Sequence, residues 1–356
     1  MQKMDFFNIP LHSWFSLHKR DLPWRNTSDP YKIWLSEIIL QQTRIDQGLE
    51  YYNRFVDEFP TIHHLSNATE DKVLKLWQGL GYYSRARNLH ATAKQIVEKH
   101  KGNFPSSYND ILGLKGIGEY TAAAIASISF NLSYPTVDGN VFRVLSRFFG
   151  IFDPIDSTTG KKTFDKLAKE LIKDTDPAFH NQALMEFGAL QCTPKKPECT
   201  KCPLSEKCYA YNNQRINELP VKQNRIKQRD RYFNYLVIDD TKTLMLRKRG
   251  ETDIWRNMYE LPFIEKTEKT EVDEVLKAGD LKNIISSKSI QSISGVSNWK
   301  IHILSHQRIH YRFITIIPTN DFVCATNIIR VNKQDIFNFA VPRLLEAFFD
   351  NYLKKY

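Results

Sequence analysis

The sequence predicts two structural classes in series, an all-α domain followed by an α+β domain. The chain has 356 residues, which exceeds the size at which one hydrophobic core usually stops growing. Helical periodicity recurs up to about residue 211, whereas short runs rich in β-branched and aromatic residues dominate after residue 230. Residues 212–229 are polar and basic with one proline, which is typical of a linker. We therefore expect domains at 1–211 and 230–356.

The first domain is expected to consist of amphipathic helices separated by short Pro, Gly and Asn signals. In the first clear segment, at 28–47, Asp29 can cap a helix and Pro30 suits its first turn. Further helical segments are predicted at 70–80, 84–100, 121–130, 139–150 and 161–172. In the second domain, strands are predicted at 232–239, 243–249, 310–318 and 322–331, and helices at 271–286 and 342–355.

Charge and composition indicate which kind of partner and which cellular compartment to expect. The formal net charge is +10 and the pI is about 9.2, which favours a polyanionic partner. No apolar run reaches the about 18 residues that a membrane span needs. The N-terminus lacks the basic-then-apolar pattern of a secretory signal. We expect a cytoplasmic, reducing environment and no membrane partner.

Four of the five cysteines lie between residues 192 and 208, in the pattern C-x6-C-x2-C-x5-C. A reducing compartment argues against two local disulfides. Four thiolates suit either a tetrahedral zinc ion or a [4Fe–4S] cluster, and ligand chemistry alone does not separate the two. The fifth cysteine, Cys324, lies in a strand-like apolar run and is expected to be a buried structural thiol.

Residues 107–130 predict a helical hairpin with a glycine turn. Gly116 and Gly118 precede a helix of small residues, and glycine lets the backbone approach a ligand closely. The free N–H groups of the helix N-terminus form a natural phosphate site. A plain connection between two helices would explain the same pattern.

Two carboxylates are candidates for chemistry. Asp138 directly precedes a predicted helix, where Asp is a common N-cap. Glu37 lies among apolar neighbours, so it is either an exposed charge on an amphipathic helix or a desolvated acid with a raised pKa. A neutral acid paired with an ionised carboxylate is the usual arrangement for glycosidic cleavage.

Several motifs together resemble adenine DNA glycosylases of the MutY family, within the helix-hairpin-helix base-excision superfamily. These motifs are LPWR at 22–25, WLSEIILQQT at 34–43, GLGYYSRARNLH at 79–90, VDGNVFRV at 137–144 and the cysteine spacing. The resemblance covers the helical half and, more weakly, the second half. It implies a helix-hairpin-helix glycosylase domain with a [4Fe–4S] cluster loop, followed by a Nudix-like domain. It also implies a monomer that removes adenine opposite 8-oxoguanine or guanine in double-stranded DNA.

The resemblance assigns roles to individual residues. Glu37 would be the general acid at N7 of adenine, Asp138 would stabilise the sugar cation, and Asn140 and Tyr120 would assist. The adenine pocket would be lined by Leu22, Trp24, Arg25 and Glu186. The opposite base would be contacted by Gln42, Leu80 and Tyr82. Phosphate would bind at Gly116 and Gly118, and the cluster would be held by Cys192, Cys199, Cys202 and Cys208.

The stretch 253–265 resembles the strand region of the Nudix-like domain. The glycine- and glutamate-rich metal-binding box of Nudix hydrolases is missing after Pro262, so Nudix hydrolysis is not expected. Ser305 and His306 match residues that check the opposite base for the 8-oxo lesion, and a serine hydroxyl can both donate and accept. Gln307 departs from the more hydrophobic residue expected at its position.

Tyr120 occupies the position of the Schiff-base lysine of endonuclease III-type enzymes. A phenol cannot form an imine, so we expect base removal without an efficient lyase step. Alternative readings are an endonuclease III-like pyrimidine-lesion glycosylase, a mismatch thymine glycosylase, or a non-catalytic iron–sulfur DNA-binding protein in which Asp138 is only a cap.

Overall fold

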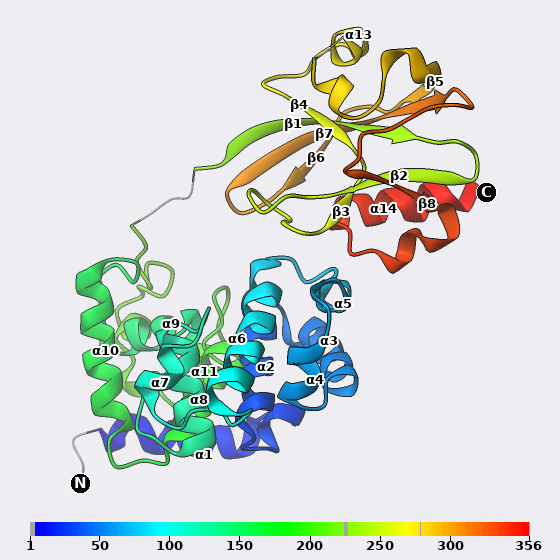
Figure 1. Cartoon of the computed structure of the whole chain (residues 1–356). Helices are drawn as coiled ribbons and strands as arrows, with labels where there is room; N and C mark the ends of the chain where they lie inside the picture. The colour runs from blue at the N-terminus through cyan, green and yellow to red at the C-terminus, as the bar shows by residue number, and fades with distance from the viewer. Residues whose placement is uncertain (1–3, 224–226, 278, 356) are drawn as a thin grey trace. The chain divides into compact units, whose positions relative to one another are not determined.

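The computed structural model describes residues 4–223, 227–277 and 279–355. The described residues form two compact units. The first comprises residues 4–67 and 88–223, and the second comprises residues 68–87 with the described residues from 227 onward. The first is helical and the second contains the sheets, which confirms the predicted order of an all-α and an α+β part (Figure 1).

The first unit contains helices α1(Asp5–His18), η1(Pro23–Arg25), α2(Pro30–Leu40), α3(Ile45–Glu58), α4(Ile62–Asn67), most of α6(Ser84–His100), α7(Tyr108–Leu112), α8(Glu119–Phe130), α9(Gly139–Phe149), α10(Thr158–Ile172), α11(Pro177–Leu190), η2(Cys199–Lys201), η3(Ser205–Lys207) and α12(Tyr209–Asn212). Its main core lies where α9 and α1 pack against α11, with Phe7, Leu145 and Phe187 almost fully buried. Among the described residues, no helix is both long and apolar enough to cross a bilayer.

The predicted helical segment 28–47 is divided, which corrects the sequence reading. Helix α2 ends at Leu40, Gln42 adopts a left-handed φ of 57°, and α3 starts at Ile45. No Gly or Pro marks this turn. The physical reason for it is the packing of α3 on α2, where a Cβ at Gly48 would lie 2.6 Å from Leu40 Cδ2.

Residues 212–223 of the predicted linker belong to the helical unit. Leu219 is buried, and Arg147 Nε donates hydrogen bonds to the carbonyl oxygens of Ile216 and Leu219 at 3.1 Å. The predicted linker also includes residues 224–226, which lie outside the described residues. The part of the linker next to the helices is therefore a docked segment.

The second unit has two sheets. The larger has the order β4(Phe263–Lys266), β1(Arg229–Ile238), β7(Gln307–Pro318), β5(Ile290–Val296), and β6(Lys300–Ile303) also pairs with β7. The smaller has the order β3(Tyr259–Glu260), β2(Thr243–Lys248), β8(Ile328–Asn332). Strands β1 and β7 are parallel, and the other pairs are antiparallel. The helices are α5(Glu70–Trp77), the start of α6, α13(Val272–Leu276), η4(Gly279–Asn283), η5(Ser287–Ser289), η6(Lys333–Asn338), α14(Arg343–Tyr352) and η7(Leu353–Lys355).

The predicted elements of the second half differ from the structure mainly at two places. The helix predicted at 271–286 forms only α13 and η4, and residue 278 lies outside the described residues. The strand predicted at 322–331 starts only at Ile328. Cys324 precedes it as a half-buried free thiol that packs against the apolar core.

Candidate active site

A cavity of about 790 Å³ in the helical unit brings together side chains from α2, α3, α8, α9 and α11 and from the segments that connect the helices. Both candidate carboxylates line it, Glu37 from α2 and Asp138 from the turn before α9. Its walls also contain the predicted residues Tyr120, Asn140, Leu22, Trp24, Arg25, Gln42 and Glu186. Residues that are up to 164 positions apart in the chain, from Leu22 to Glu186, therefore share one site.

Glu37 is held in a mostly apolar helix that positions it on the cavity wall. Asp29 caps α2 by accepting a hydrogen bond from the Tyr31 N–H at 2.9 Å, and Ile33 and Ile38 are buried in the core. Burial raises the pKa of Glu37 to about 7, a hydrogen bond with Tyr120 acts in the opposite direction, and the charge of Asp138 raises the pKa further. Glu37 can therefore hold a proton close to neutral pH.

Ionisation of Glu37 should reduce stability. The pKa of Glu37 is about 7 in the folded protein, whereas its ordinary value is 4.5. Protonated Glu37 therefore contributes fully to the free energy of unfolding below about pH 4.5, and this contribution is lost as the pH rises to about 7. The loss is at most about 3 kcal/mol. We expect Glu37→Gln to melt at a higher temperature than the wild type, by a larger margin at pH 8 than at pH 5. An equal margin at both pH values in thermal melts would contradict the raised pKa.

Asp138 is both a helix cap and a wall of the cavity. Its Oδ1 accepts hydrogen bonds from the backbone N–H groups of Asn140 at 2.9 Å and Val141 at 2.8 Å. Its Oδ2 accepts one from Asn140 Nδ2 at 2.8 Å. Burial raises the pKa of Asp138, and these hydrogen bonds lower it part of the way back by favouring the ionised form. The same geometry thus caps α9 and holds a carboxylate beside Glu37.

Arg143 connects this carboxylate to the cysteine segment. Its guanidinium donates to Asn140 Oδ1 at 2.8 Å, to the Gly188 carbonyl at 2.6 Å and to the Cys192 carbonyl at 2.7 Å. The close approach of α9 and α11 requires glycine at 188, because a Cβ there would lie 2.7 Å from Asn140 Cβ. Asp138, Asn140, Arg143 and Cys192 therefore form a continuous polar chain.

We expect Arg143→Gln to weaken both the fold and the site. Glutamine cannot reach all three acceptors, and each unpaired buried group costs about 1–3 kcal/mol. The melting temperature should fall, and base release should slow because Asn140 loses the group that orients it. The matched control is Lys169→Gln, which removes an exposed ion pair with Asp165. If Arg143→Gln matched this control in melting temperature and in the rate of base release, the chain of contacts would contribute to neither stability nor activity.

Glu186 lines the cavity, and two arginines occupy its carboxylate oxygen atoms. The side chain is buried and accepts hydrogen bonds from Arg25 at 2.7 and 2.8 Å and from Arg20 at 2.5 and 2.8 Å. Burial alone would raise its pKa, but the hydrogen bonds from the two arginines outweigh burial and lower the pKa to about 2. Glu186 therefore acts on the cavity by positioning the guanidinium groups.

Arg20 is a cavity residue that sequence reasoning missed. It lies in an irregular stretch before η1, where no periodicity or motif separates it from its basic neighbour Lys19. Only its pairing with Glu186, 166 residues later, reveals its place.

The helical hairpin is formed by α7 and α8. Gly116 has a φ of 74°, and a Cβ there would lie 2.6 Å from Asn88 Cβ, so the turn requires glycine. Gly118 begins α8 without a side-chain cap, and a Cβ there would meet open space. The backbone N–H groups of the first turn thus have room for an anion.

A second cavity, of about 510 Å³, lies within the other unit. Tyr82, Ser305 and His306 line it, and the hydroxyl groups of Tyr82 and Ser305 are hydrogen bonded to each other. Leu80 is buried and is not among the lining residues. Of the residues predicted to contact the opposite base, Gln42 lines the first cavity, Tyr82 lines the second, and Leu80 lines neither.

The four clustered cysteines surround one apolar cavity. Cys192, Cys199, Cys202 and Cys208 line it together with Val144, Phe148, Phe187 and Leu204. None of these thiols is disulfide bonded. Within the described residues, no group of three or more His, Cys, Asp or Glu is arranged to hold a single metal ion. The fold nevertheless brings all four thiols to one place, as joint ligation of a metal group requires.

Comparison with known proteins agrees with these features. Residues 35–173 match the family described as HhH-GPD superfamily base excision DNA repair protein, and residues 234–351 match the NUDIX domain. An adenine DNA glycosylase of Buchnera aphidicola subsp. Baizongia pistaciae is 33% identical over 353 residues, covering 97% of this chain and 94% of that protein. Another, of Buchnera aphidicola subsp. Schizaphis graminum, is 36% identical over 303 residues, covering 84% and 86%.

Among solved structures, a thermostable thymine-DNA glycosylase is 30% identical with a TM-score of 0.55, and the match covers 59% of this chain and 97% of that one. This match covers little more than half of the chain, whereas the two relatives from Buchnera cover 97% and 84% of it. The chain therefore belongs to the adenine DNA glycosylase family.

Proposed function

We propose that this protein removes adenine from 8-oxoguanine:adenine and guanine:adenine mispairs in double-stranded DNA and leaves the strand intact. The observation that carries the proposal is the pair Glu37 and Asp138 in one cavity, one with a pKa of about 7 and the other held by three hydrogen bonds. Such a pair can act as acid and as charge stabiliser in glycosidic cleavage.

The chemistry follows from the protonation states. Protonated Glu37 donates its proton to N7 of adenine, so the base leaves as a neutral purine. Ionised Asp138 stabilises the oxocarbenium-like sugar that forms as the glycosidic bond breaks, and water then adds to the sugar carbon and releases a proton that replaces the one given by Glu37. Leu22 and Trp24 provide apolar walls for a flipped base, and Arg25 provides a donor at its edge. The cavity volume of about 790 Å³ leaves room for a nucleotide turned out of the duplex.

The proposed cofactor is a [4Fe–4S] cluster bound by Cys192, Cys199, Cys202 and Cys208. When bound, it supplies four covalent anchors to a segment with little core of its own. Arg147 donates to the carbonyl oxygens of Thr193 at 2.8 Å and Pro194 at 3.2 Å, which orients the start of the segment. Lys195, Lys196, Lys201 and Lys207 in this segment are candidates for phosphate contacts.

The deciding experiment measures base release from duplexes that differ only at one pair: A:8-oxoguanine, A:G, A:C, A:T and G:T. We expect rapid adenine release opposite 8-oxoguanine, slower release opposite guanine, and no thymine release from G:T. Faster thymine release than adenine release would replace this proposal by the mismatch thymine alternative, which the similarity to the solved thymine-DNA glycosylase makes worth testing.

Strand cleavage is predicted to require added alkali. Tyr120 Oη donates to Met185 Sδ at 3.2 Å in the cavity, and its pKa is raised well above the ordinary value by burial and then by Glu37, so it remains a neutral phenol. It cannot form the imine that a lyase needs. Borohydride should therefore trap little covalent enzyme–DNA adduct. Tyr120→Lys provides a comparison, because it introduces an amine at this place, and abundant trapping by the wild type would refute the prediction.

A further inference from the structure

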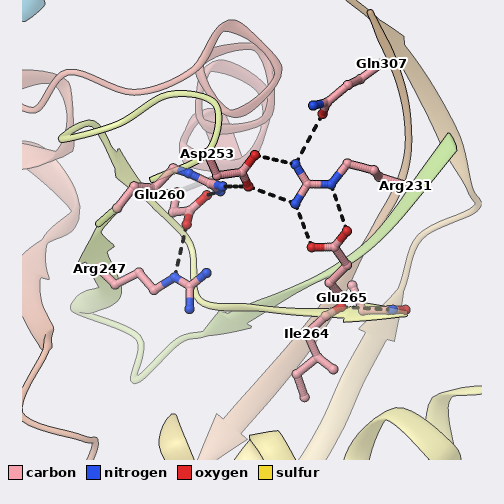
Figure 2. A network of polar contacts seen from close by, with 9 residues as sticks. Arg231, Arg247, Asp253, Glu260, Ile264, Glu265 and Gln307 are labelled. Carbon is pink, nitrogen blue, oxygen red and sulfur yellow. Dashed lines mark hydrogen bonds and ion pairs between the residues drawn. The ribbon is translucent and has the colours of Figure 1, made fainter. Parts of the chain in front are cut away.

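A network of charged side chains in the second unit centres on the buried Arg231 of β1 (Figure 2). Its guanidinium has five N–H donors, and each is used. Two go to Glu265 at 2.6 and 2.8 Å, two to Asp253 at 2.7 and 2.8 Å, and the fifth to Gln307 Oε1 at 3.2 Å. Arg231 is only 6% exposed, so a lost acceptor would leave a buried donor unpaired.

Gln307 is the residue that the resemblance left unexplained, and this network accounts for it. It begins β7 directly after Ser305 and His306. The parallel register pairs Gln307 with Arg229, so Arg231, two residues on, projects from the same face of the sheet. A hydrophobic side chain at 307 would offer no acceptor to the fifth donor. Gln307 therefore connects the end of the Ser305–His306 turn to Arg231 on β1 by a hydrogen bond.

Asp253 ties a second segment to the same point. It lies in the connection between β2 and β3, where Asp253, Trp255 and Asn257 have φ values of 77°, 56° and 62°. Such left-handed conformations are costly for these residues and persist when surrounding contacts hold them. Asp253 accepts hydrogen bonds from Arg231 and, at 2.8 Å, from Arg249, whose other terminal nitrogen donates to Glu260 at 2.6 Å.

Both tied segments line the cavity of about 510 Å³. Asp253, Ile254 and Trp255 contribute from one segment, and residues 303–307 contribute from the other. The rings of Trp255 and His302 lie 6.0 Å apart, so the two segments also meet beside the cavity. Arg231 binds one acceptor from each segment, Asp253 and Gln307, and so fixes the distance between the two walls of the cavity.

We propose that Arg231, acting through Asp253 and Gln307, positions the walls of this cavity and so determines how strongly the enzyme prefers 8-oxoguanine over guanine opposite adenine. The inference rests on the proposed function, since it needs the cavity to receive the opposite base. Arg231 does not line the cavity itself. It is a positioning residue, and its effect should be seen in selectivity rather than in the glycosidic chemistry.

The test compares single-turnover rates of adenine release from A:8-oxoguanine and A:G duplexes. Gln307→Leu should lower the ratio of the two rates about tenfold, because a displaced wall would forfeit about one hydrogen bond to the 8-oxo base. Gln307→Glu keeps an acceptor and should retain the ratio. Asp253→Asn is a second variant with the same expected direction. The matched control is Arg247→Gln, which breaks the pair with Glu260 at 3.0 Å on the far side of the network and leaves both walls tied.

The possible results distinguish a failure of this inference from a failure of the proposed function. A reduced ratio in Gln307→Leu and Asp253→Asn, with an unchanged ratio in Gln307→Glu and Arg247→Gln, is the expected result. An unchanged ratio in both Gln307→Leu and Asp253→Asn overturns the inference alone. An equal loss of ratio in Arg247→Gln also overturns it, because the effect would then come from general destabilisation. A wild-type enzyme without any preference for 8-oxoguanine overturns the proposed opposite-base recognition and the inference with it.

Discussion

Replacing Glu37 by Gln is expected to slow adenine release by about 10²–10⁴-fold under single-turnover conditions, the contribution of a positioned general acid. Glutamine has nearly the same shape and keeps polar atoms that can hydrogen bond with the Tyr120 hydroxyl, so the cavity should be preserved. It has no proton of suitable acidity for N7 of adenine. Affinity for the A:8-oxoguanine duplex, measured by fluorescence anisotropy, should therefore stay close to that of the wild type.

The matched control for this variant is Glu50→Gln. Glu50 lies on α3, is 71% exposed and pairs loosely with Arg54 at 4.0 Å. Removal of its charge should leave the rate unchanged. Near wild-type release by Glu37→Gln would rule out Glu37 as the acid, whereas loss of both release and binding would point to a structural role.

Asp138→Asn should slow release by about 10²–10³-fold, the usual loss when one group that stabilises transition-state charge is removed. Asparagine is a good N-cap, and its carbonyl oxygen can still accept from the N–H groups of Asn140 and Val141. What is lost is the negative charge beside the forming sugar cation, together with the acceptor that Oδ2 offers to Asn140 Nδ2. The melting temperature should therefore change little compared with the change in rate.

Asp176→Asn provides the comparison for this variant. Asp176 caps α11 by accepting from the Phe179 N–H at 3.0 Å and is not among the residues that line the cavity. It should retain full activity. If Asp138→Asn lost stability in proportion to its activity while Asp176→Asn lost neither, the role of Asp138 would reduce to capping.

Sequence reasoning predicted the two fold classes because hydrophobic periodicity is a local property. It could not predict that α2 and α3 separate at Gln42, since that turn results from packing of Gly48 against Leu40 and has no glycine or proline signal. Spacing alone also left Asp138 as a common N-cap and left Glu37 open between an exposed charge and a desolvated acid. Only the resemblance joined them, and the fold then placed both on one cavity.

Long-range pairing explains the remaining differences. Glu186 lines the cavity, but the sequence does not indicate that Arg20 and Arg25 occupy its oxygen atoms. Gln307 was an unexplained departure until Arg231 supplied its partner from β1. Each of these contacts joins residues more than 70 positions apart, and the choice of partner depends on tertiary structure rather than on neighbouring sequence.

The pH dependence of adenine release tests most directly the claim that a protonated Glu37 begins the reaction. The single-turnover rate on an A:8-oxoguanine duplex would be followed through the neutral range, with Glu37→Gln as reference. Because burial raises the pKa of Glu37 to about 7, the wild-type rate should fall as pH rises above neutrality, and the residual rate of Glu37→Gln should lack that decline. A wild-type rate that stays constant or rises across the same range would contradict the account.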